Sequence, residues 1–383
     1  CSSVPSARIR GNEIFRDKHV RNLLIFPNFK GFGIGYHFGN RWWGPGFHSS
    51  LQMTNNSWPF GSYIIGTMNE LRFGKIGLSA LYSFSSLSDK YNPIKKFHTA
   101  LNGKISWYGS LLISAGFSRN YLSGGDKSVS GKIWTEQNAQ LLVFEGLLTS
   151  NLINKEYTIG GHDKWDQTIS GYFSIVDFNK RLKLYAEIGF NDNRMYLADL
   201  ISQPDHTMAT IIGIRDYGNS KRANDSNFIY GFEWTNLMIT YTIRHRGLPG
   251  TPEWYNRPLY DYSSNNSRRW GAHSGSDSDD WLFYFGYLSN KILIIPAFNY
   301  ERHGIVSHRP AEVKFEFRLD IKYNYLNSWF GVYFEIQKDM FLGFPDYFYE
   351  DKFGKPIDSS EGKIANSRNT STLILSFNKF INF

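Results

Sequence analysis

Side chains suited to holding a sugar are concentrated in one long polar segment, residues 245–280. Gly and Pro bracket it, so we expect a long loop, the largest in the chain. Sugar rings present apolar C–H faces and many hydroxyls, so their sites use flat aromatic rings, planar hydrogen-bonding groups and, for acidic sugars, Arg. The segment is therefore a candidate polysaccharide site, although a solvated plug that narrows a pore would have the same composition. The candidate residues are Trp254, Tyr255, Arg257, Tyr260, Arg268, Arg269 and Trp270.

A second unusual peptide lies near the start of the chain and is rich in large flat side chains. Its residues are Arg41, Trp42, Trp43, Gly44, Pro45 and Gly46, followed by Asn55 and Asn56. Pro45 cannot donate a hydrogen bond to a strand neighbour, and the flanking glycines admit positive φ angles. The peptide is therefore expected to be a tight bend that carries its Trp side chains for structural reasons or for ligand contact.

Metal and cofactor chemistry is weakly indicated. Asp277, Asp279 and Asp280 could offer carboxylates to Ca²⁺, but their spacing lacks the EF-hand pattern. The lone cysteine excludes a Cys-rich zinc module and a disulfide scaffold. We expect a solvated acidic loop here, with no metal and no cofactor.

Catalysis is also weakly indicated. The sequence contains no G-x-S-x-G elbow, H-E-x-x-H pair, phosphate-binding loop or dinucleotide fingerprint. His48 and Ser49 resemble the pair of a lipid hydrolase, but adjacent residues of a strand face opposite ways. We expect no catalytic residues and no enzyme activity.

The net charge of +8 does not indicate a nucleic-acid partner, because basic and acidic residues are interleaved along the chain. A basic lumen or rim that attracts lipopolysaccharide or an acidic surface polysaccharide is the simpler interpretation.

The elements that must position these residues show alternation of apolar and polar positions. From Val313 to Tyr323, apolar side chains alternate with Lys, Glu, Arg and Asp, and residues 181–190 repeat the pattern. Such a period of two predicts strands with one apolar and one charged face. The candidate strands are 62–73, 75–84, 98–108, 111–120, 132–144, 170–177, 181–190, 209–217, 228–235, 238–245, 281–288, 293–300, 313–323, 329–337 and the last strand from 372.

These strands favour a single transmembrane antiparallel β-barrel over a soluble sandwich. No run of about 18 apolar residues exists, so no helix is predicted to span a bilayer. Membrane strands need about 9 to 11 residues, and about 16 to 18 strands, with 18 favoured, would use roughly half of the chain. Aromatic residues near strand ends suit the membrane interface, and the last strand alternates up to Phe383.

The stretch RWWGPGFHSSLQMTNNSWP, residues 41–59, resembles the signature of the Wzi family of capsule-assembly outer-membrane proteins. Residues 267–286, with Gly271, His273 and Gly275, resemble a later motif of Bacteroidetes-type members. The resemblance implies a non-enzymatic barrel of the bacterial outer membrane that binds surface polysaccharide and helps attach or organise a capsule. The alternative is a structural subunit of an outer-membrane complex for secretion, assembly or nutrient uptake, with other outer-membrane proteins and lipid as partners.

The start of the sequence indicates a lipoprotein. The only cysteine is Cys1, followed by small residues, as in a lipidated mature N-terminus. We expect residues 1–30 to form a periplasmic segment lipidated at Cys1, and residues 31–383 to form the barrel.

Overall fold

The structure is a computed structural model of the whole chain. It describes the residues 22–87, 95–124, 136–144, 165–179, 181–191, 201–216, 227–242, 254–255, 263–265, 268–306, 311–325, 328–342 and 366–379.

One antiparallel sheet of 17 strands dominates the described residues, and a short hairpin stands apart from it. The all-β fold is confirmed, and the 17 strands lie within the predicted range of 16 to 18, although 18 was favoured. The sheet contains β1 (Leu23–Ile25), β2 (Asn28–Phe29), β3 (Phe32–Gly39), β4 (Phe60–Thr67), β5 (Leu71–Phe73), β6 (Ile76–Leu87), β7 (Lys96–Tyr108), β8 (Leu111–Gly124), β9 (Asp166–Asp177), β10 (Leu182–Asn191), β11 (Met208–Asp216), β12 (Asn227–Asn236), β15 (Ser278–Leu288), β16 (Ile292–His303), β17 (Glu312–Tyr325), β18 (Ser328–Leu342) and β19 (Asn366–Lys379), and the hairpin consists of β13 (Ser264–Asn265) and β14 (Arg268–Arg269).

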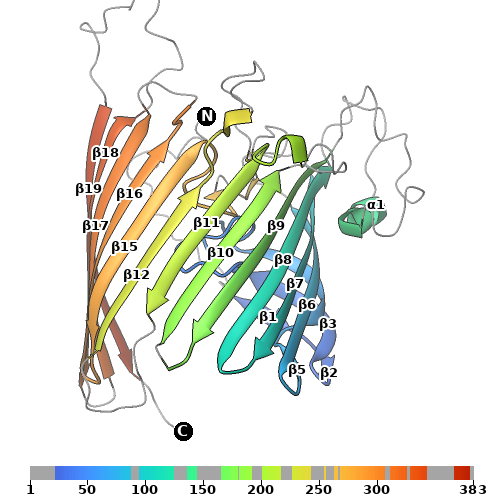
Figure 1. Cartoon of the computed structure of the whole chain (residues 1–383), viewed down its shortest axis with the longest axis horizontal. Helices are drawn as coiled ribbons and strands as arrows, with labels where there is room; N and C mark the ends of the chain where they lie inside the picture. Colours follow the sequence, from blue (N-terminus) through green and yellow to red (C-terminus); the bar gives the residue numbers. More distant parts are fainter. Residues whose placement is uncertain are drawn as a thin grey trace, which may run out of the picture.

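Strands that follow one another in the chain are neighbours in the sheet. From β6 to β12 each strand pairs with the next, β12 pairs with β15, and the order then continues to β19. At the other end, β1 and β2 both pair with β3, which pairs with β4, and β4 and β5 both pair with β6. Figure 1 shows this sheet curving around an interior that holds the connection between β3 and β4.

Burial along the strands is the reverse of that in a soluble protein. In β10, Leu184 and Ile188 are 46% and 45% exposed, whereas the alternate residues Tyr185 and Glu187 are 4% and 1% exposed. In β15, Trp281, Phe283 and Phe285 are exposed, and the residues between them are buried. The apolar face therefore points outward and the polar face points into the enclosed interior.

Ion pairs between neighbouring strands cover the inner face of β17. Lys314 Nζ lies 2.7 Å from Glu301 of β16 and 3.3 Å from Glu316, and Arg318 pairs with Glu316. Because such charges are taken out of bulk water, they need these partners. The charged face of the predicted strand 313–323 is thus satisfied inside the sheet.

Three predicted strands differ in the structure. The predicted strand 62–73 is divided into β4 and β5, because residues 68–70 are not in a strand. The described part of 132–144 forms α1 (Glu136–Leu141) and the 3-10 helix η2 (Leu142–Phe144), and β12 ends at Asn236 with no strand over 238–242. Residues 136–141 are good helix formers, and buried apolar residues from α1 and η2 pack against rings from β6, β7 and β8. Tertiary packing therefore decides a segment whose local pattern is ambiguous.

Residues 23–29, which the sequence analysis placed in an N-terminal segment, belong to the sheet as β1 and β2. Among the described residues, no helix has the length and apolar character to cross a membrane.

Candidate functional site

The 40–59 segment, which connects β3 to β4 and contains the Trp-Trp bend, is fastened to the inner face of the sheet. Glu233 of β12 accepts hydrogen bonds from the backbone N–H groups of Phe47 (2.7 Å), His48 (3.2 Å) and Ser49 (2.5 Å). The hydroxyl of Tyr185 also donates to this carboxylate, which is fully buried. A single buried charge on the wall therefore satisfies three consecutive donors of the segment.

The bend has the tight geometry that its sequence predicts. Gly44 has a φ of +148°, and a Cβ atom there would lie 2.6 Å from Ser50 Oγ and 2.7 Å from Glu187 Oε2. Trp42 Nε1 donates to the carbonyl of Gly46 at 2.9 Å, and Trp43 N donates to the carbonyl of Met53 at 3.0 Å. Only glycine fits at position 44, because a side chain would meet both the bend and the wall.

Another part of the segment is held by different strands of the wall. Gln52 Oε1 accepts hydrogen bonds from Asn120 of β8 (2.6 Å) and Thr168 of β9 (2.7 Å). Together with Glu233 of β12, these contacts attach the segment to separated strands of the sheet. It therefore fills the interior as a fixed part of the fold.

The 254–277 segment, described at 254–255, 263–265 and 268–277, packs directly on the 40–59 segment. Thr54 N donates to the carbonyl of Trp270 at 2.5 Å, and Thr54 Oγ1 donates to that of Gly271 at 2.8 Å. Tyr255 donates its hydroxyl to the carbonyl of Leu51 at 2.6 Å. The two peptides that stood out in the sequence thus form one interior unit.

The predicted aromatic candidates of this unit are buried by protein. Trp254, Tyr255 and Trp270 are 0%, 2% and 4% exposed, and Trp270 packs against the rings of Phe60 and His98. In this conformation their rings hold the two segments together. Their contact with polysaccharide stays a prediction, and Arg257, Tyr260 and Cys1 lie outside the described residues.

The accessible edge of the unit combines an arginine, a tryptophan and amides. The guanidinium carbon of Arg268, an exposed residue, lies 4.9 Å from the centre of the Trp58 ring, which is partly exposed. Asn55, three residues before Trp58, is exposed. The next residue is Asn56, whose Nδ2 donates a hydrogen bond to the carbonyl of Arg269 at 3.0 Å. Trp58 is not among the residues predicted from the sequence, although its position just after the double Asn is a usable signal.

Arg41 is a buried charge without a carboxylate partner among the described residues. Its Nε donates to His37 Nδ1 at 3.0 Å, and its other two nitrogens find no hydrogen-bond partner in the described part of the chain. Burial lowers the pKa of Arg41 to about 10. The side chain also lies 6.0 Å from the Phe60 ring centre, so its main contacts are with the interior packing.

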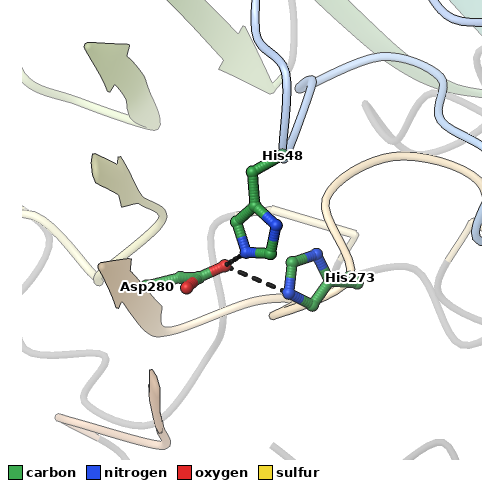
Figure 2. A group of neighbouring side chains, drawn as sticks. All are labelled: His48, His273 and Asp280. Atoms are coloured by element: carbon green, nitrogen blue, oxygen red, sulfur yellow. Dashed lines mark hydrogen bonds and ion pairs between the residues drawn. The ribbon is translucent and has the colours of Figure 1, made fainter. Parts of the chain in front are cut away.

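Two histidines and an aspartate meet where the two segments touch the wall, as Figure 2 shows. His48 Nε2 and His273 Nε2 lie 2.9 Å and 3.1 Å from the same oxygen, Oδ2 of Asp280 in β15. His48 lies more than two hundred positions from the other two residues, so no local sequence pattern indicates this cluster. A set of two imidazoles and a carboxylate is typical of transition-metal sites.

Other polar groups that the sequence analysis considered have structural contacts. Asp279 pairs with Arg302 through both carboxylate oxygens, and Asp277 accepts hydrogen bonds from the backbone of Ile239 (3.2 Å) and Val306 (2.9 Å). Ser49 is fully buried, and its hydroxyl has no hydrogen-bond partner among the described residues. The described geometry therefore contains no paired Ser49 and His48 of the hydrolase type.

Comparison with known proteins shows the fold of this chain. No protein-family model matches the sequence, and no curated protein matches it. The chain is similar in structure to Wzi, an outer-membrane protein involved in group 1 capsule assembly in Escherichia coli and a carbohydrate-binding β-barrel. The TM-score is 0.59 with 12% sequence identity, over 93% of this chain and 69% of that chain. At this identity the likeness supports an antiparallel β-barrel fold and no more.

Proposed function

We propose that this chain is a β-barrel of the bacterial outer membrane that binds surface polysaccharide at the end of the barrel where the long connections lie. The reversed burial of its strands carries the membrane part of the proposal. Large apolar side chains such as Phe298 (55% exposed) and Leu375 (73% exposed) lie outside, while buried carboxylates line the interior. A contiguous apolar exterior of this kind is stable in acyl chains and would aggregate in water.

The fixed interior unit supports the binding part. The 40–59 connection and the 254–277 segment leave from the same end of the sheet and meet inside it, with Trp58 and Arg268 at their accessible edge. An aromatic ring under a guanidinium, beside amide groups, offers both the apolar and the hydrogen-bonding contacts that an acidic sugar needs. The carbohydrate-binding barrel of similar fold is consistent with this use of the interior. By binding polysaccharide in this way, the protein would help to attach or organise a capsule.

The test is retention of acidic capsular polysaccharide by the purified barrel on a glycan column. We expect Trp58→Ala combined with Arg268→Ala to reduce retention at least about tenfold, since a stacked ring contributes about 1 kcal/mol and a charge-assisted hydrogen bond about 1.5 kcal/mol or more. Arg72, whose guanidinium carbon lies 3.5 Å from the Tyr108 ring centre, is a matched arginine–aromatic pair near the short turn between β7 and β8. Arg72→Ala is expected to keep full retention. Equal loss in both variants, or retention unchanged by the double substitution, would contradict the proposed binding site.

A further inference from the structure

Three possible metal-ligand side chains from separate parts of the fold meet inside the barrel: His48, His273 and Asp280. His48 belongs to the 40–59 segment, His273 to the 254–277 segment, and Asp280 to the wall strand β15. One ligand atom from each residue lies within 4.8 Å of the other two. The side chains of His48 and Asp280 are 8% and 0% exposed, and that of His273 is 23% exposed.

The hydrogen bonding of this cluster is incomplete without a further group. Asp280 Oδ1 is buried and has no hydrogen-bond partner among the described residues, and within hydrogen-bond distance His273 Nε2 has only the contact at 3.1 Å with the other oxygen of Asp280. Both imidazoles approach the other oxygen, Oδ2, and their rings meet edge to face with centres 4.6 Å apart. Buried polar atoms left in this state are costly, so the arrangement favours a bound cation that would use them.

From this geometry we infer that His48, His273 and Asp280 bind a divalent transition-metal ion of the zinc class. Ligands around a tetrahedral Zn²⁺ lie about 2.0 to 2.2 Å from the ion and therefore roughly 3.3 Å from one another. The two imidazole nitrogens lie 2.9 Å and 3.1 Å from Asp280 Oδ2, close to this spacing, and all three ligand atoms lie within 4.8 Å of one another, so side-chain rotations that draw the imidazoles together would admit the ion. Two imidazole nitrogens favour Zn²⁺ and its neighbours over Ca²⁺ or Mg²⁺, which prefer oxygen ligands. From the sequence we expected no metal, because the spacing of Asp277, Asp279 and Asp280 lacks the EF-hand pattern and His48 is distant in the chain.

The charged groups next to the proposed site are paired with one another and do not compete for the ion. Glu301 of β16 lies 3.8 Å from His273, and its charge is shared with Lys314 (2.7 Å) and His303 (3.0 Å). His303 in turn lies 2.7 Å from the carbonyl of Ser274, within the 254–277 segment. The ion would therefore tie both interior segments to β15 and fix the unit that carries Trp58 and Arg268.

The inference is tested on the full chain in detergent, which is stripped of metals with a chelator, incubated with Zn²⁺ and freed of excess Zn²⁺ before its metal content is measured; the stripped chain is used for the affinity measurement. We expect about one Zn²⁺ per chain by elemental analysis, and a d–d absorption band when Co²⁺ replaces it. His273→Gln and Asp280→Asn each remove a ligand and are expected to weaken Zn²⁺ binding by more than about 100-fold in calorimetry. His303→Gln, the matched control, removes an imidazole that contacts Glu301 and Ser274 and is expected to change the affinity less than tenfold.

A second measurement uses the chain without substitutions, so it does not depend on whether the variants fold. His273 and His303 have similar side-chain exposure, 23% and 28%, so diethylpyrocarbonate modification of both can be followed by mass spectrometry. Zn²⁺ is expected to slow modification of His273 at least about fivefold relative to His303. Less than one-tenth of a Zn²⁺ per chain, equal protection of the two histidines, or undiminished affinity in a folded His273→Gln variant would each overturn the inference.

Discussion

Replacing Glu233 with Gln probes the contact that holds the 40–59 segment to the barrel wall. The carboxylate accepts three backbone hydrogen bonds, from Phe47, His48 and Ser49, and one from the hydroxyl of Tyr185. The amide keeps one acceptor oxygen, loses the negative charge and turns a donor group toward an N–H. Since a hydrogen bond to a charged group is worth about 1.5 to 3 kcal/mol, we expect the segment to be held about 2 to 4 kcal/mol less tightly.

Hydrogen exchange read by mass spectrometry measures this loss. A cost of about 2 to 4 kcal/mol corresponds to exchange that is on the order of 30- to 900-fold faster for the peptide covering residues 42–56, because 1.36 kcal/mol is a factor of ten. Glu316→Gln is the matched control, since Glu316 is also a buried carboxylate of the inner wall but its ion pairs are with Lys314 and Arg318. Exchange that rises less than threefold in Glu233→Gln, or rises equally in Glu316→Gln, would refute the role given to Glu233.

Four further changes have expected outcomes. Gly44→Ala places a Cβ against Ser50 and Glu187 at positive φ, so we expect about 1 to 3 kcal/mol of strain and a lower urea midpoint for folding into lipid vesicles; an unchanged midpoint would contradict the tight bend. Trp270→Ala removes a ring packed on Phe60 and His98, and we expect a loss of about 3 to 5 kcal/mol in the same assay. Phe298→Arg on the outer face is expected to cost about 2 to 4 kcal/mol in vesicles if it lies near the middle of the bilayer, so a neutral effect there would count against lipid contact. Burial by itself lowers the pKa of His273, but the charges of Glu301 and Asp280 outweigh burial and hold this pKa above its ordinary value. Protons therefore compete with Zn²⁺ for the imidazole, and calorimetry should show the Zn²⁺ affinity falling as the pH drops from about 8 to about 5.5.

The strands could be predicted from the sequence because their pattern is local. In residues 181–190 and 313–323 the period of two is visible without any knowledge of neighbours, and both segments are strands with the expected two faces. For residues 132–144 the local pattern predicted a strand, which was wrong, because their apolar positions suit a strand or a helix equally well. Packing of the helical residue Ala139 against the wall favours the helix. Local pattern thus gives the sheet and misses elements that depend on distant contacts.

The site could be predicted only in part. Both unusual peptides were recognised, and the bend at Gly44 follows directly from its residue types. Their contact with each other joins residues more than two hundred positions apart, as between Thr54 and Gly271, and no sequence period reports it. For the same reason the sequence did not show that Trp254 is buried rather than available to a ligand, or that His48 meets Asp280.

The proposed membrane barrel requires the outward face of the sheet to be in contact with acyl chains while the inward face is not. Glu335 and Ile336 are adjacent in the middle of β18, with Glu335 paired to inner-face Arg318 and Ile336 47% exposed on the outside. A fluorophore on Ile336→Cys or Glu335→Cys, each in a Cys1→Ser background, would report which residue meets lipid when nitroxide-labelled acyl chains are added to vesicles. We expect strong quenching at position 336 and little at position 335; equal quenching at both, or stronger quenching at 335, would show that the outward face is not the lipid-facing one.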